Sequence, residues 1–231
     1  MALADYLECS LNERNELLGA ASYSPLEVLL QGAELEAAIK PCRVLLYKYM
    51  HYPAYIINRD WNILEFNPLA LKFFDLNAED LATIAPQGVN LLGLVFDPAL
   101  PVRPMFERVS ETNWRQFARR ELRGFRWENR LCQYEEWYKN FFERLRVLPD
   151  FESIYAQSDI SDYSENEVLE FISRFRRLDG GIVSIKSIFA RTGHGSYPQV
   201  VFCVPGDAYS EDVFRQLGVQ LPPWHDKYIV L

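Results

Sequence analysis

One hairpin-and-helix segment most constrains the fold, because its hydrophobic pattern changes from strand-like to helical within a few positions. Residues 53–58 (PAYIIN) are apolar and rich in β-forming side chains, and residues 63–66 (ILEF) form a second stretch of this kind. Residues 59–62 (RDWN) supply turn chemistry between them, so the two stretches predict a β-hairpin. The Asn-Pro pair at 67–68 follows at once and is typical of a helix cap and the first helical position. The segment therefore predicts a hairpin that leads directly into a helix.

Helical patterns precede this segment. Residues 3–19 place apolar side chains at helical spacing and predict one amphipathic helix. After a break before Pro25, a second helical run extends to about Met50, and Pro41 predicts a kink or a join within it. We therefore expect an N-terminal helical part, residues 1–50, ahead of the main domain.

Further helices and a second hairpin follow the segment. Residues 89–96 have a helical pattern, and residues 107–147 form the clearest helical region, with rings repeated at helical spacing. Residues 182–191 and 199–204 predict an antiparallel pair of strands, and residues 210–217 predict a short closing helix. This order predicts an α+β fold whose antiparallel sheet is split by a large helical insertion.

Composition and charge argue against several classes of protein. The formal net charge of −8 repels phosphate backbones, so the chain alone is a poor candidate for nonspecific nucleic-acid binding. No apolar stretch approaches the roughly 20 residues of a membrane span, and the N-terminus lacks the apolar core of a signal peptide. The four cysteines are far apart and are expected to be buried thiols: Cys9, Cys42, Cys132 and Cys203. We therefore expect a soluble, cytoplasmic protein without contact to a membrane.

The hairpin-and-helix segment, residues 53–74, resembles the start of the MmyB-like transcription regulator ligand-binding domain. That family's pattern runs Pro-Ala, strand, Arg-x-Trp-(Asp/Asn), strand, Asn and an apolar helix. Further matches keep the family's order: NLLGLVFDP (90–98), Trp114 in a helix, PDFESIYAQSDI (149–160) and the hairpin after Gly181. The stretch NERNELLGAASYSP (12–25) is similar to the family's connection between DNA-binding and sensory domains, with Ser22 where a glycine is usual. The resemblance covers residues 12 to about 217.

The resemblance implies a PAS-like sensory domain that binds a small apolar, fatty-acid-like molecule. In the family an XRE-type helix-turn-helix half precedes the region that matches here from Asn12, so we expect DNA contact only through such a domain, absent from this chain. The ligand-binding domain is expected at residues 51–218, with a C-terminal tail at 219–231. One departure is the sequence LDG (178–180), where many members have a His-Pro pair before a glycine. If that pair contacts a ligand, the ligand here differs.

The aromatic residues, 14% of the chain, either pack a core or line a pocket. For any one residue core packing is the simpler interpretation, whereas the whole set, together with the resemblance, favours a pocket between sheet and helices. The candidate lining residues are Tyr55, Ile57, Phe66, Phe73, Phe74, Leu92, Val95, Phe96, Trp114, Phe117, Phe141, Leu145 and Phe202. Arg115 is a candidate anchor for a ligand carboxylate, with surface ion pairing or docking of a DNA-binding domain as the alternatives.

The sequence gives no support for catalysis. His194 lies in a glycine-flanked turn and His225 in the tail, and neither has a nucleophile or metal ligand at a recognisable spacing. We therefore expect no enzyme, cofactor or metal site, and the alternative is an enzyme whose acid and base are scattered along the chain. Leu7, Leu11 and Leu18 recur near heptad spacing and predict a homodimer that forms through the N-terminal helices.

Overall fold

The computed structural model describes most of the chain: residues 2–21, 23, 30–48, 51–77, 79–80, 89–161, 163–164, 171–177, 180–192 and 197–218. Several sequence predictions fall elsewhere. The turn that holds His194, the tail that holds His225 and the start of the helical run after Pro25 lie outside the described residues.

A five-stranded antiparallel sheet forms the centre of the fold, in the order β2-β1-β5-β4-β3. Its strands are β1 Ala54–Ile57, β2 Ile63–Phe66, β3 Ser173–Arg176, β4 Ile182–Arg191 and β5 Gln199–Pro205. Both predicted strand pairs are confirmed, and pairing of β1 with β5 joins them into one sheet. Strand β3 was not predicted. The result is the expected α+β architecture, consistent with a PAS-like domain.

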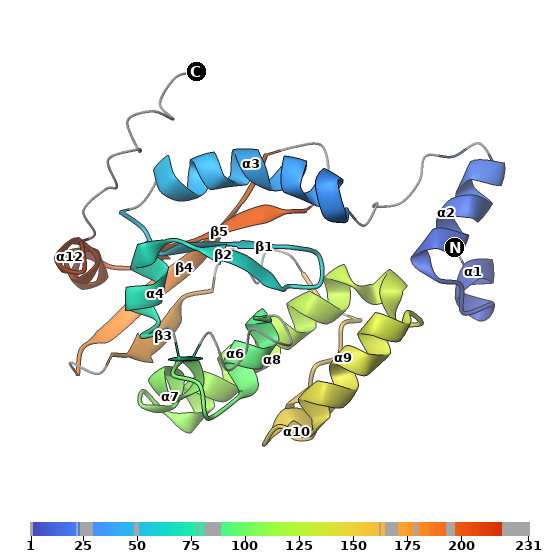
Figure 1. Ribbon diagram of the computed structural model, residues 1–231. Coiled ribbons are helices and arrows are strands. Elements are labelled where there is room, and N and C mark those ends of the chain that lie inside the picture. Colours follow the sequence, from blue (N-terminus) through green and yellow to red (C-terminus); the bar gives the residue numbers. More distant parts are fainter. Residues whose placement is uncertain are drawn as a thin grey trace.

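One face of the sheet is covered by α3 (Gly32–Lys48) (Figure 1). Ile39, Cys42 and Leu46 of this helix are buried and form a small cluster with Ile56 of β1 and Val200 of β5. The predicted join at the proline of this helix is wrong, because α3 continues through it as a single helix.

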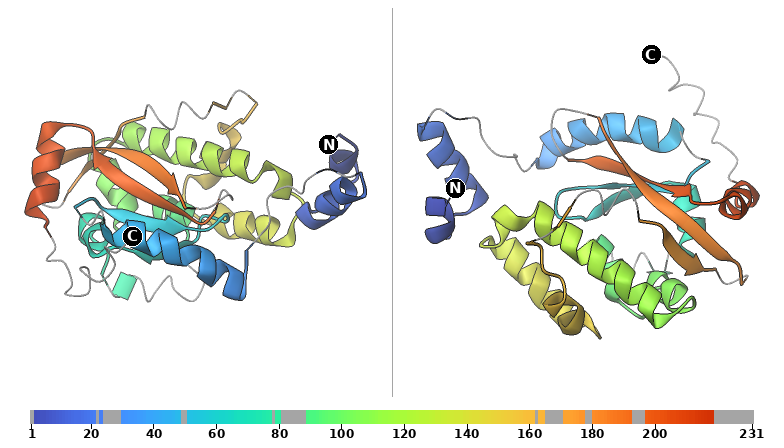
Figure 2. Two further views of the ribbon diagram at one scale, coloured as in Figure 1. Left: turned by 90° about the horizontal axis from the view of Figure 1, so that it is seen from above. Right: turned by 180° about the vertical axis from the view of Figure 1, so that it is seen from behind.

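The other face of the sheet carries the helical insertion, and this side holds the larger core (Figures 1 and 2). Its helices are α4 Pro68–Phe73, α6 Leu91–Phe96, α7 Val102–Glu107, α8 Glu111–Glu128, α9 Glu136–Arg146 and α10 Phe151–Ala156, with a 3₁₀ turn at Arg130–Cys132. Helix α12 (Ala208–Gln216) lies beside β4 and β5. Because β-strand side chains alternate between faces, Tyr55 and Ile57 join this larger core whereas Ile56 faces α3.

Asn67 is a structural residue at the junction of hairpin and helix. Its side-chain oxygen accepts hydrogen bonds from the backbone amides of Ala70 (2.8 Å) and Ala54 (3.1 Å). Its amide nitrogen donates to the carbonyl of Tyr52 at 2.8 Å, and the side chain is fully buried. It caps α4 as predicted and also fixes the start of β1.

The N-terminal residues form two short helices, α1 (Ala2–Tyr6) and α2 (Leu11–Ala20), so the prediction of one helix over 3–19 is wrong. Ser10 caps α2 and exchanges hydrogen bonds with Glu13, which starts a new helix at that point. The backbone amide of Leu11 donates to Glu135, next to α9, and this contact ties α2 to the insertion.

Candidate ligand-binding pocket

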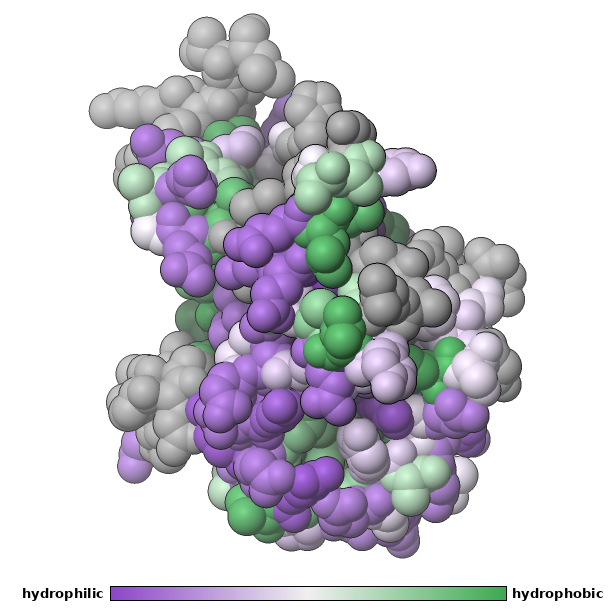
Figure 3. Space-filling model, turned by 90° about the vertical axis from the view of Figure 1, so that its right-hand side faces the viewer, coloured by the Kyte–Doolittle hydropathy of each residue, from purple (hydrophilic) through white to green (hydrophobic). Residues whose placement is uncertain are grey.

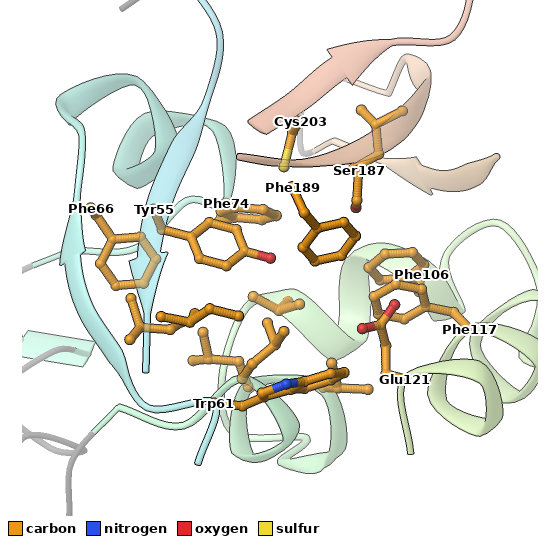
Figure 4. A pocket seen from close by; sticks show the side chains of 17 residues that line it. Tyr55, Trp61, Phe66, Phe74, Phe106, Phe117, Glu121, Ser187, Phe189 and Cys203 are labelled. Atoms are coloured by element: carbon orange, nitrogen blue, oxygen red, sulfur yellow. The ribbon is translucent and has the colours of Figure 1, made fainter. Parts of the chain in front are cut away.

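An apolar pocket lies between the sheet and the helices of the insertion (Figure 4). Strands β1, β2, β4 and β5 form one wall, and α6, α7 and α8 form the other. The lining residues are Tyr55, Ile57, Trp61, Ile63, Phe66, Phe74, Leu91, Leu94, Val95, Val102, Phe106, Phe117, Glu121, Ile185, Ser187, Phe189 and Cys203. Most of these side chains are aliphatic or aromatic, which is the usual composition of a small-molecule site.

The pocket is small in the conformation described. Its cavity volume is about 40 Å³, compared with about 150 Å³ for an engineered protein cavity that binds benzene. A ligand larger than a few atoms must therefore displace side chains of the wall. Phe66, Phe74 and Phe189 are only partly buried, so their rings can move at lower cost than the fully buried rings of the core.

Few polar side chains line the pocket, and they converge on its centre. The hydroxyl of Tyr55, the hydroxyl of Ser187 and the thiol of Cys203 point inward from the sheet, and the carboxylate of Glu121 points toward them from α8 (Figure 4). Burial raises the pKa of the Tyr55 hydroxyl well above 10. Burial, and then the negative charge of Glu121, raise the pKa of the Cys203 thiol to about 12. Both groups therefore stay protonated and neutral at physiological pH.

Trp61 closes the pocket where the hairpin meets α8. Its indole nitrogen donates to Glu128 (2.8 Å) and to the hydroxyl of Tyr197 (3.1 Å), and Tyr197 donates to the same carboxylate. A Cβ atom at Gly124 would lie 3.3 Å from the indole, so glycine allows this close approach of α8. The backbone of Trp61 is left-handed (φ 57°), which is uncommon for a bulky residue.

The predicted lining residues divide into three groups. Six of them line the pocket: Tyr55, Ile57, Phe66, Phe74, Val95 and Phe117. Phe73, Leu92, Phe96, Trp114, Phe141 and Leu145 do not border it and are buried in the core of the insertion side. Phe202 faces the opposite side of the sheet, in the cluster with α3.

Arg115 lies outside the pocket. Its guanidinium pairs with Glu111 (2.8 Å) and with Asp150 (2.7 Å), and it also bonds the hydroxyl of Ser153. This placement corresponds to the ion-pairing alternative, and Arg115 is not among the lining residues of the pocket. Two further arginines of α8 bond backbone carbonyls after α10: Arg123 to Asp159 at 2.8 Å and Arg126 to Ser158 at 2.5 Å.

The sequence interpretation missed several lining residues, and Glu121 is the most informative of them. It lies four residues after Phe117 and four before Phe125, so helical spacing alone places this acid on the apolar face of α8. Ser187 and Phe189 on β4 could have been found in the same way, because they alternate with side chains of the other face.

Within the described ranges, no group of three or more His, Cys, Asp or Glu side chains could hold a metal ion. All four cysteines are buried and free, as predicted. None of the described helices is both long enough and apolar enough to cross a membrane.

An antiparallel sheet whose helical cover leaves an apolar pocket with a few convergent polar groups is typical of a small-molecule-binding domain. Comparison with protein families places the chain more specifically: it belongs to the MmyB-like transcription regulator ligand binding domain family, whose model matches residues 41–217. A search of curated proteins found no match. The family supports a ligand-sensing regulatory role and favours a sensor over an enzyme.

Proposed function

We propose that this chain is the ligand-sensing part of a bacterial transcription regulator and that its pocket binds a small apolar molecule with a fatty-acid-like alkyl part. The observation that carries the proposal is the apolar pocket between sheet and insertion, in a chain of a ligand-binding-domain family. Each buried methylene of an alkyl chain contributes about 0.8 kcal/mol, so walls of this composition suffice for affinity once the rings move.

The proposal also covers how the regulator contacts DNA and in which compartment it works. The acidic chain, with its net charge of −8, is unsuited to hold DNA by itself, so DNA contact would belong to a helix-turn-helix domain of the regulator. The four free thiols fit the reducing cytoplasm.

Filling the pocket is expected to abolish ligand retention. Cys203 points into the pocket from β5, and Cys203→Leu adds apolar atoms to a cavity of only about 40 Å³. The neighbouring Val204 packs on the opposite face with α3, so Val204→Leu is the matched control. Mass spectrometry after denaturing extraction should find an apolar molecule with wild type and the control, and at least about tenfold less with Cys203→Leu, which is about 1.4 kcal/mol of binding free energy.

Two results would contradict the proposal. One is equal retention by Cys203→Leu and wild type. The other is that no small molecule is found in any of the three proteins and that octanol does not raise the melting temperature of wild type. A ligand at 100 times its Kd should stabilise the folded protein by about 2.7 kcal/mol, so binding of octanol would be visible as such a rise.

A homodimer through the N-terminal helices is the second element of the proposal. Tyr6, Leu7, Leu17 and Tyr23 are exposed, whereas Leu11 is buried against its own chain and is removed from the expected heptad stripe. The side of the molecule that carries α1 and α2 shows several apolar groups among hydrophilic ones (Figure 3). We expect light scattering at tens of micromolar to give a dimer mass, and a double substitution Leu7→Ser with Leu17→Ser to give the monomer. A monomeric wild-type chain at that concentration would exclude this arrangement.

A further inference from the structure

We infer that the ligand of the pocket carries a head group that donates hydrogen bonds, such as an alcohol or a primary ammonium group, and that Glu121 and Tyr55 bind it. This inference rests on the proposed function, because it concerns the same pocket. It differs from the sequence-based expectation of a carboxylate anchored by an arginine.

Glu121 offers an unused acceptor to the pocket. Both hydrogen bonds that Arg120 makes with it, from Nε at 3.0 Å and from Nη2, go to the same carboxylate oxygen, Oε1. The other oxygen bonds none of the residues that the structure describes, although the side chain is only 13% exposed. Glu121 lines an apolar pocket, where a carboxylate oxygen without a hydrogen bond is poorly solvated, so a donor from a ligand or a water is the expected partner.

Tyr55 supplies a second unused polar group. Its hydroxyl points into the pocket (Figure 4), and the residue is 6% exposed. Within the described part of the chain it is near Glu121 and Cys203 but makes no hydrogen bond to either. A neutral tyrosine hydroxyl both donates and accepts, so it can accept from the head group that donates to Glu121. Ser187 adds another hydroxyl of the same kind at the pocket wall.

The electrostatics of the pocket disfavour an anionic head group. Among the described lining residues Glu121 is charged, and none is a lysine, arginine or histidine. A ligand carboxylate would bring a second negative charge beside it in a poorly solvated site, where like charges disfavour each other strongly. The guanidinium of Arg120 is already paired with Glu121 and lies 4.0 Å from the ring centroid of Phe171 and 5.1 Å from that of Phe117. The guanidinium of Arg120 therefore has partners of its own and does not line the pocket.

The test compares three probes that share one alkyl chain: octanol, octylammonium and octanoate, each titrated at neutral pH into the full chain by calorimetry. We expect octanol and octylammonium to bind wild type at least about tenfold more tightly than octanoate. Glu121→Gln should weaken the binding of octylammonium at least about tenfold. It should also bring the affinity for octanoate closer to the affinity for octanol. Glu111→Gln, an exposed acid on the same helix, should change none of the three affinities.

A second variant keeps the inference testable if Glu121→Gln fails to fold. Tyr55→Phe preserves the ring and removes only the hydroxyl, so it should weaken octanol by about tenfold while the melting temperature without ligand stays close to wild type. Preference of wild type for octanoate, or an unchanged order of the three probes in both variants, would overturn the head-group assignment while leaving the proposed apolar pocket intact. Failure of every probe to bind would instead count against the proposed function and the inference together.

Discussion

Arg103→Met is expected to lower the free energy of unfolding by about 3 kcal/mol or more, because the substitution breaks a buried network of charges and carbonyls. The Arg103 side chain is 7% exposed. Its Nη1 donates to the carbonyls of Phe96 (2.9 Å) and Pro149 (3.1 Å), and its Nη2 to the carboxylate of Asp150 at 2.6 Å. The guanidinium also lies 3.8 Å from the ring centroid of Trp114. Methionine fills similar space but leaves these acceptors without their donor.

Arg115 provides the matched control, because it binds the same carboxylate from the solvent side. It bonds Asp150 at 2.7 Å, but its side chain is 36% exposed. Exposed ion pairs contribute about 0–1 kcal/mol, so Arg115→Met should stay within that range of wild type. Urea denaturation of the three proteins at neutral pH measures the difference. Equal losses for the two variants would refute the role assigned to the buried arginine.

The pH dependence of this pair has a definite sign. The hydrogen bond from Arg103, followed by the charge of Arg115 and then that of Arg103, holds the pKa of Asp150 below its usual value. A lowered pKa in the folded state contributes stability above the unfolded pKa and loses it as pH falls through the folded value. The stability gap between wild type and Arg103→Met should therefore narrow as pH falls below about 4, near the ordinary pKa of an aspartate.

The local elements of the fold were predictable where turn and cap chemistry is explicit. The hairpin of β1 and β2 and the start of α4 follow from the turn after β1 and from Asn67 and Pro68. Strand β3 was missed because its sequence, Ser-Arg-Phe-Arg, buries one ring, that of Phe175, and offers little alternation. Helix α7 was missed because Pro104 lies inside it. These two elements depend on tertiary contacts: β3 pairs with β4, and α7 packs on α8.

The pocket was predictable as a region but not residue by residue. Phe73 and Phe74 are neighbours of the same type, yet Phe74 lines the pocket whereas Phe73 is fully buried in the core. On β5, Cys203 faces the pocket and Phe202 faces α3, because adjacent strand residues point to opposite faces. Periodicity identifies a buried face but does not say which part of that face leaves a cavity, since this depends on how the rings of several elements meet.

Phe125→Ala is the second substitution with a large expected effect, about 3–5 kcal/mol of unfolding free energy. Phe125 is fully buried on α8. Its ring centroid lies 5.1 Å from that of Phe141 and 5.9 Å from that of Phe142, both on α9, and 5.5 Å from that of Trp61. Alanine removes the ring through which α9 packs on α8 and leaves a dry void. Chemical denaturation should also show a much smaller loss for Phe125→Leu, which retains most of the buried volume.

Phe117 tests whether a ring of the pocket wall behaves differently from a ring of the core. It lies two helical turns before Phe125 on the same face, is only partly buried, and stacks on Phe106 with centroids 3.9 Å apart. Phe117→Ala should therefore cost less than Phe125→Ala, about 2 kcal/mol, and should enlarge the pocket instead of leaving a closed void. Octanol should restore part of the stability lost in Phe117→Ala and none of that lost in Phe125→Ala. Equal losses of unfolding free energy in the two variants, with no stabilisation of either by octanol, would place Phe117 in the core and not in the pocket wall.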